Sequence, residues 1–285
     1  MKKLKIMMLG IVMLCLTGCI KKDNYENISI YTTVYPVTYI AKYLYDDYAE
    51  INSIYPNGVD ADTYEISNKK LNDFSKGDLF IYNGLSSEKD IAAELLNKNK
   101  KMDIIDVSQG LEVKSDISEL WLSPANFLMM MTNIKNNLKE YITNKSILDS
   151  IDKNYDNLKV QISEIDAELS LMADNASNKK IIVANNAFKF LEKYGFEVIS
   201  VSAEDENSNT NISRAKKYFS DKENTYLFML DNTTENETIK SLKNSGATEQ
   251  VVARLLTLSE ENSKNGTDYI SYIKDILDII KKEIY

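Results

Sequence analysis

The chain has 285 residues, of which 44% are hydrophobic and 27% charged, so it can bury substantial cores and is not disordered on composition. Its net charge of −9 argues against nucleic acid as a partner, because phosphate binding relies on clustered Lys and Arg. It contains no histidine, which excludes Ser-His-Asp and Cys-His nucleophile systems and every histidine-bearing zinc site.

The chain opens with the layout of a secretory signal peptide. Three lysines among the first five residues precede an apolar run over residues 6–16, which is shorter than the ~20 residues of a membrane span. The run ends in Leu-Thr-Gly-Cys, with small residues directly before Cys19. These four residues resemble the lipobox of bacterial lipoproteins. The alternative is an ordinary signal peptide in which the cysteine is incidental.

The lipobox resemblance implies that residues 1–18 are removed and that Cys19 receives lipid. Residues 19–27 then form a short polar tether. We expect the protein to be anchored to the cell membrane on its extracytoplasmic face, because several acyl chains together hold a protein stably at a bilayer. The other cysteine, Cys15, lies in the removed segment, so no internal disulfide is expected.

Residues 28–143 alternate between strand and helix patterns. Short runs rich in β-forming residues predict strands over residues 28–33, 51–55, 78–82 and 102–107. Periodic apolar residues predict helices over residues 37–48, 68–74, 90–97 and 125–141. This alternation favours a parallel sheet with helices on both faces, and we assign residues 28–143 to an N-terminal α/β lobe.

Residues 144–176 carry the most regular pattern in the chain. Seven apolar residues follow one another at steps of three and four from Ile147 to Leu169, with no Gly or Pro between Asn144 and Asn175. A helix of about 30 residues spans roughly 45 Å, which is longer than one lobe is wide. We predict a helix that bridges two lobes. The alternative is a dimeric coiled coil, which so few heptads make less attractive.

The α/β pattern restarts in residues 177–285. Strands are predicted over residues 180–183, 197–201, 225–230 and 250–256, and helices over residues 187–194, 213–219, 235–243 and 268–284. The predicted fold class is therefore α/β, with two similar lobes of parallel sheet joined by one long bridging helix. Such a plan is typical of a protein that binds a ligand in the cleft between its lobes.

Five segments, in order along the chain, resemble the zinc and manganese receptors of ABC importers. Residues 55–65 (YPNGVDADTYE) are similar to the family's Pro-Gly-Val-Asp-Pro-His-x-Tyr-Glu-Pro loop. Residues 77–84 (GDLFIYNG), 119–124 (ELWLSP), 185–190 (NNAFKF) and 266–269 (GTDY) resemble four further family motifs. The resemblance implies two α/β lobes bridged by a rigid helix, with a single metal ion held between them.

The positions at which this family holds its metal are changed here. The first and second family histidines fall on Asp62 and Glu119. The third ligand position, His or Glu in the family, falls on Asn185, and the fourth, acidic in the family, falls on or near Leu258. If a metal is bound at all, the resemblance assigns it to Asp62, Glu119 and Asn185, with Leu258 as an apolar wall.

Oxygen donors decide which cations such a site could take. Carboxylate and amide oxygens suit magnesium, calcium or manganese, whereas imidazole and thiolate suit zinc. Two nearby carboxylates repel, so one must take up a proton or a cation, and that cation could be a divalent metal or an organic amine. The alternative is that these residues are solvated cleft side chains without a ligand. Asp60 and Glu65, the next acids, are interpreted as loop residues.

The resemblance implies a function in transport rather than catalysis. We expect a monomeric solute-binding lipoprotein that delivers one divalent cation, or another cation, to an ABC permease powered by a separate ATPase. The alternative is a surface adhesin or regulatory protein that keeps the scaffold without binding metal. An enzyme is the third choice, since clustered carboxylates could do acid–base work but nothing in the sequence marks a substrate.

Overall fold

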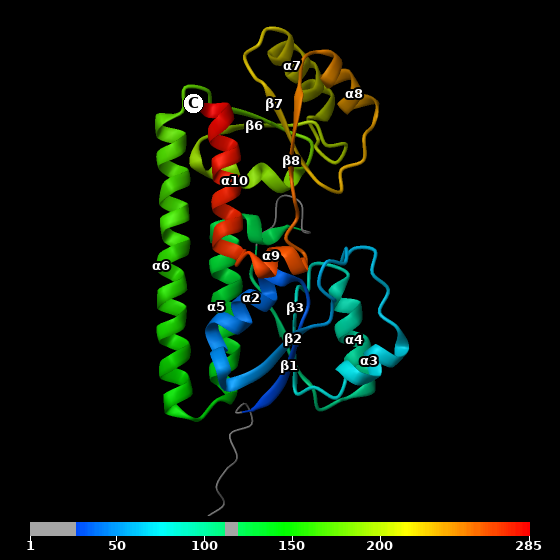
Figure 1. The fold of residues 1–285 in the computed structure, drawn as a ribbon, viewed down its shortest axis with the longest axis vertical. Helices are drawn as coiled ribbons and strands as arrows, with labels where there is room; N and C mark the ends of the chain where they lie inside the picture. Colours follow the sequence, from blue (N-terminus) through cyan, green and yellow to red (C-terminus); the bar gives the residue numbers. More distant parts are fainter. Residues whose placement is uncertain (1–26, 112–118) are drawn as a thin grey trace, which may run out of the picture.

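The computed structural model describes residues 27–111 and 119–285 (Figure 1). The signal peptide and Cys19 lie outside these residues, so what the sequence indicates about them stays a prediction. In the described ranges, no helix is both long enough and apolar enough to cross a membrane. The described residues form two α/β lobes of parallel sheet, which confirms the predicted fold class.

The N-terminal lobe is built on a four-stranded parallel sheet in the order β2-β1-β3-β4. Its inner strands are fully buried because helices cover both faces. The strands are β1 (Ile28–Thr32), β2 (Ala49–Ser53), β3 (Leu79–Tyr82) and β4 (Asp103–Asp106). The helices are α2 (Tyr35–Tyr45), α3 (Asn68–Phe74), α4 (Glu88–Lys98) and α5 (Pro124–Tyr141), with 3-10 turns at η1 (Asp46–Tyr48) and η2 (Leu120–Leu122).

The C-terminal lobe repeats this strand order as β6-β5-β7-β8, again all parallel. Its strands are β5 (Lys180–Val183), β6 (Glu197–Ser200), β7 (Tyr226–Leu230) and β8 (Thr248–Val252). Between them lie η3 (Asn186–Tyr194), α7 (Ser208–Ser220) and α8 (Glu237–Asn244), followed by α9 (Glu260–Lys264) and α10 (Tyr269–Ile284). Since both lobes are parallel, the carboxyl ends of their strands gather along one edge of each sheet.

The predicted bridging helix is α6 (Lys145–Asn175), which runs beside both lobes in Figure 1. The side chain of Asn144 caps its start by accepting a hydrogen bond from the backbone N–H of Ser146 at 2.9 Å. The helix packs against α2 and α5 of the first lobe and against α10 and η3 of the second. The seven apolar residues of the predicted stripe are all buried in this packing.

One apolar core runs through both lobes on the side of the molecule where α6 and α10 lie (Figure 1). At its centre the ring of Tyr269, in the first turn of α10, stacks on Phe127 of α5 with centroids 3.7 Å apart. The Tyr269 hydroxyl donates a hydrogen bond to the carbonyl of Trp121, whose side chain is 1% exposed. The lobes are thus fixed to each other along this side by buried aromatic packing.

The structure differs from the sequence-based elements at two places near the cleft. Strand β8 ends at Val252, whereas the pattern predicted a strand to residue 256. The carbonyls of Ala253 and Leu256 accept hydrogen bonds from the Tyr272 hydroxyl and the Tyr35 backbone N–H instead of from a neighbouring strand. Residues 253–258 therefore form a loop between the lobes. The segment predicted as a helix over 187–194 is the 3-10 helix η3.

Candidate functional site

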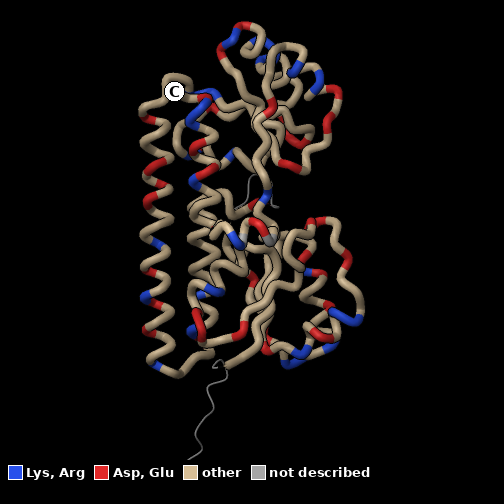
Figure 2. Tube along the Cα trace, viewed as in Figure 1, with Lys and Arg blue, Asp and Glu red and all other residues tan. Residues whose placement is uncertain are grey.

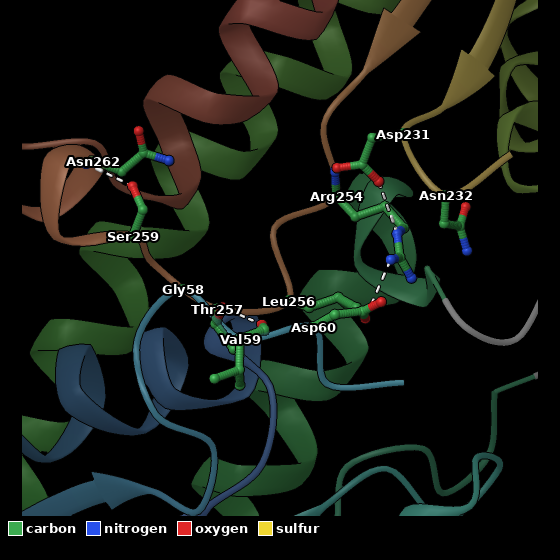
Figure 3. A pocket seen from close by; sticks show the side chains of 10 residues that line it. All are labelled: Gly58, Val59, Asp60, Asp231, Asn232, Arg254, Leu256, Thr257, Ser259 and Asn262. Atoms are coloured by element: carbon green, nitrogen blue, oxygen red, sulfur yellow. Dashed lines mark hydrogen bonds and ion pairs between the residues drawn. The ribbon is translucent and has the colours of Figure 1, made fainter. Parts of the chain in front are cut away.

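A cavity of 440 Å³ lies where loops of the two lobes meet (Figure 3). One wall comes from the loop after β2 and the other from the segments that follow β7 and β8. In open parallel sheets, ligands bind outside the carboxyl ends of the strands, which is where these segments lie. The cavity is lined by Gly58, Val59, Asp60, Asp231, Asn232, Arg254, Leu256, Thr257, Ser259 and Asn262.

Arg254, two residues beyond β8, is the centre of this junction. Its backbone N–H and Nε donate to the two carboxylate oxygens of Asp231, at 3.1 and 2.9 Å, within the C-terminal lobe. Its two terminal nitrogens reach the other lobe, where one pairs with Asp62 and the other with Asp60 at 3.3 Å. The Arg254 side chain is only 8% exposed, and Figure 3 shows it extended between Asp231 and Asp60.

The electrostatics of the junction keep Arg254 charged. Burial by itself would lower the pKa of Arg254, but hydrogen bonds to Asp231 and Asp62 and the charges of Asp62 and Glu119 outweigh burial and raise it. Three carboxylates around one guanidinium leave an excess of negative charge. The same excess acts on Tyr272, whose pKa is raised by burial first and then by the charges of Glu119 and Asp231.

The loop after β2 is shaped to present its acids to the C-terminal lobe. Gly58 has a left-handed backbone with φ of 75°, which a side chain would strain. Asp60 accepts a hydrogen bond from the backbone N–H of Asp62 at 3.1 Å, a local turn that fixes both carboxylates. The Thr257 hydroxyl donates to the carbonyl of Val59 at 2.8 Å, which ties the loop directly to the other lobe.

The structure brings the positions inferred from the family resemblance only partly together. Asp62 is paired with Arg254, and Glu119 is 2% exposed and acts electrostatically on that same arginine. The Asn185 side-chain oxygen is directed within its own lobe, where it accepts from the Leu230 backbone N–H at 2.9 Å and from the Thr233 hydroxyl at 3.0 Å. Three of the four positions are therefore engaged by protein groups.

Leu258 lies apart from the acids. It lines a second cavity of 410 Å³ with the rings of Tyr35 and Tyr55. Leu256 is the leucine that lines both this cavity and the one around Arg254. The apolar wall beside the acids is thus formed by Leu256.

Within the residues that the structure describes, no group of three or more His, Cys, Asp and Glu side chains is arranged to hold a metal ion. The reason is visible in the ion pairs: the guanidinium of Arg254 lies between Asp60, Asp62 and Asp231, in the space where a cation would be bound. The expectation of an unpaired, mutually repelling pair of carboxylates was therefore wrong for Asp62, which has a chain-borne cation as its partner.

Sequence reasoning missed Arg254 and Asp231 as site residues. Two signals were available. Arg254 is one of only two arginines in the chain, the other being Arg214, and a rare guanidinium suits a planar contact with carboxylates. Asp231 directly follows the buried strand β7, at the strand end where α/β sites form. The predicted extension of β8 to residue 256 placed Arg254 in a strand and concealed its role.

Comparison with known proteins identifies the fold and the lineage. Residues 30–283 match the family described as zinc-uptake complex component A, periplasmic. The chain belongs to this family. The match spans both lobes and the bridging helix, so the resemblance drawn from the five sequence motifs is confirmed.

The relatives of this zinc-uptake component are named as metal-binding lipoproteins. The chain is 27% identical to a metal ABC transporter substrate-binding lipoprotein of Lactococcus lactis, over 94% of the chain and 92% of the relative. It is 24% identical to the high-affinity zinc uptake system protein ZnuA of Bacillus subtilis, over 91% and 88%. It is 22% identical to the zinc-binding lipoprotein AdcA of Streptococcus pneumoniae over 99% of its own length, but it spans only 61% of that protein.

Solved structures share the fold of this family member at low sequence identity. The metal-dependent lipoprotein YcdH of Bacillus subtilis superposes with a TM-score of 0.74 at 20% identity, over 90% of this chain and 99% of that one. The zinc-bound ZnuA-like domain of Streptococcus pneumoniae AdcA gives 0.72 at 22% identity, with the same coverage. The family is one of substrate-binding transport proteins, so the two-lobed scaffold is one that relatives use to hold a metal ion.

Proposed function

We propose that this chain is an extracytoplasmic solute-binding lipoprotein of a metal-type ABC importer, with an altered site, that captures a cation between its lobes and delivers it to a membrane permease. The observation that carries the proposal is the convergence of Asp60 and Asp62 from one lobe with Asp231 from the other around a single positive charge. Such an arrangement favours cations over anions. A separate ATPase would supply the energy, so we infer no catalytic role for this chain.

The donors at the junction set the class of cation. All are oxygen atoms, and with no histidine in the chain the tight zinc coordination of imidazole sites is not available. We expect zinc to bind no more tightly than about micromolar, near −8 kcal/mol. A hard divalent cation or an organic amine suits the carboxylates better, and it would have to exchange with the guanidinium of Arg254.

Arg254 favours a second candidate function. Because the chain supplies its own cation at the junction, the scaffold can be held together without a solute, as a non-transporting surface adhesin or regulator would require. The two candidates differ in one measurable property: the first requires a solute that binds the cleft and the second does not.

Calorimetric titration and thermal unfolding of chelator-treated protein with zinc, manganese, calcium and spermidine test the proposal. We expect one of the last three to stabilise the fold by about 2.7 kcal/mol at a hundredfold excess over its dissociation constant. Asp62→Asn with Glu119→Gln should abolish that stabilisation. The matched control is Asp156→Asn with Glu164→Gln, which makes the same charge change on the exposed side of α6.

Two results would count against cation capture. Nanomolar, stoichiometric zinc binding would contradict the expected preference for harder cations. If none of the four cations bound, capture in the cleft would fail and the non-transporting candidate would be favoured.

A further inference from the structure

Polar contacts between the lobes concentrate in the loop after β8. Arg254 forms ion pairs across the cleft with Asp60 and Asp62. Two residues on, the carbonyl of Leu256 accepts a hydrogen bond from the backbone N–H of Tyr35 at 2.7 Å, and the Thr257 hydroxyl donates to the opposite loop. A segment of four residues thus carries several charged or polar contacts from the C-terminal lobe to the N-terminal lobe.

The two sides of the lobe junction are held by different forces. Beside α6 and α10, aromatic stacking of Tyr269 on Phe127 and a continuous apolar core join the lobes. At the cleft the contacts described above are hydrogen bonds and ion pairs, and α4 and α8 lie on the side of their lobes turned away from α6 (Figure 1). A molecule fixed along one side and joined by ion pairs at the other can hinge about the fixed side.

We propose that Arg254 is a latch that holds the cleft closed in the absence of any solute. Its guanidinium supplies the positive charge that lets carboxylates of both lobes approach one another, a task that a bound cation would otherwise perform. Asp231 holds the guanidinium in position from its own lobe through the backbone N–H and Nε of Arg254. The latch goes beyond the proposed function, because it acts whether or not a cation is transported.

Charge explains why removal of Arg254 should open the cleft. Without the guanidinium, Asp60 and Asp62 face Asp231 across the cleft with Glu119 buried nearby, and like charges at short range repel. Arg254 is also the partner best suited to this place, since a planar guanidinium can bind several carboxylates at once, whereas an ammonium cannot match that geometry. Arg254→Lys should therefore restore only part of the closure.

Distance measurements between spin labels test the latch. Among residues 20–285 there is no cysteine, so the mature chain with Cys19→Ser offers a background free of thiols. Labels at Ala93→Cys on α4 and Lys240→Cys on α8, both exposed, report the separation of the two lobes on the cleft side. All samples contain a chelator and no added cation, so the result does not depend on whether the protein captures a solute.

With Arg254 present we expect one narrow distance distribution. Arg254→Met should add a longer and broader population and raise the ratio of open to closed molecules at least about tenfold, which corresponds to about 1.4 kcal/mol. Arg214→Met is the matched control, because it removes the other arginine, which pairs with Glu197 at the far edge of the C-terminal sheet. That variant should leave the distribution unchanged.

A second variant keeps the test decisive if Arg254→Met does not fold. Asp60→Asn with Asp62→Asn cuts only the pairs that cross the cleft and leaves the contact of Arg254 with Asp231 intact, so it should also open the cleft. Distributions that match the starting protein in the folded variants would overturn the latch. Cation titration remains a separate result: it can fail while the latch holds, and the latch can fail while cations bind.

Discussion

A single guanidinium determines what kind of site this family member has. In the resemblance, the cleft positions belong to metal ligands, but Asp62 here pairs with Arg254 and the oxygen of Asn185 binds groups of its own lobe. An arginine stays protonated at any physiological pH, so this internal cation is permanent in a way that an exchangeable metal is not. The acids keep the electrostatic character of a cation site while the chain itself supplies the cation.

A second buried carboxylate next to the site gives the fold a pH dependence. Glu88 at the start of α4 is 6% exposed, lines a small cavity with Asp62 and Trp121, and accepts a hydrogen bond from the Asn83 backbone N–H at 2.7 Å. Burial raises the pKa of Glu88 to about 7, and the nearby charge of Asp106 adds to this, while the Asn83 hydrogen bond opposes it. The protonated form is therefore favoured in the folded protein.

The sign of the pH effect follows from that raised pKa. Between the ordinary pKa of 4.5 and about 7, the folded protein binds more protons at Glu88 than the unfolded chain does. The free energy of unfolding should consequently fall as the pH rises through this range, by up to roughly 3 kcal/mol. Glu88→Gln should remove this contribution, as measured by urea unfolding at pH 5 and pH 7.5.

The control for the pH prediction is Glu94→Gln, an exposed position on the same helix, which should keep the pH dependence of the original protein. If the slope of stability against pH were the same with glutamate and with glutamine at position 88, the assignment of this titration to Glu88 would be wrong.

At the scale of elements, α6 is the part of the fold most directly encoded in the sequence. Its apolar residues recur at steps of three and four, and all seven of them are buried against both lobes. Apolar residues off this stripe, Val160 and Leu171, are 57% and 60% exposed. The stripe therefore determines which face of the helix packs, and the helix determines how far apart the two sheets lie.

Substitutions on and off the stripe test this role of α6. Ile162 is 2% exposed, so Ile162→Asp would place an unpaired charge against apolar side chains and should lower the free energy of unfolding by about 3 kcal/mol or more. Glu164 is exposed, and Glu164→Ala should change stability by no more than about 0.5 kcal/mol. Equal shifts of the melting temperature in the two variants would remove the assignment of the buried face.

At the scale of the whole molecule, the two lobes are similar in topology but are joined asymmetrically. Apolar packing along α6 and α10 fixes one side, and the loop after β8 connects the other through Arg254. Lysines and arginines are interspersed with acids over both lobes, as Figure 2 shows, so the positive charge of Arg254 at the lobe junction stands out by its burial rather than by number. The cleft depends on how the lobes are placed and not on either lobe alone.

Attachment to a membrane is the whole-molecule property that depends on the predicted leader. Relatives are named as lipoproteins, and the sequence places Cys19 directly after small residues. Cys19→Ser should abolish lipid attachment and move the protein from the membrane fraction into the soluble extracytoplasmic fraction, as followed by metabolic labelling with palmitate and by immunoblotting. Retention of labelled or membrane-bound protein after the substitution would contradict the lipobox interpretation.

The sequence by itself determined the architecture because that information is local. Periodic apolar residues define α6, short β-rich runs define the strands, and turn chemistry such as Gly58 defines the loop that carries Asp60 and Asp62. Loss of every histidine is likewise a property of composition, and it limits the metal chemistry without any structure. These features gave the fold class, the bridging helix and the membership of a metal-receptor family.

Only the tertiary structure decided what occupies the cleft. Arg254 lies 192 residues from Asp62 in the chain, and no local pattern relates them. The pair forms because β8 ends at Val252, where Tyr272 and Tyr35 take up the carbonyls of the following loop and turn Arg254 toward the other lobe. A charge contact between lobes depends on the packing of the complete chain, so its place in the site could be known only once both lobes were assembled.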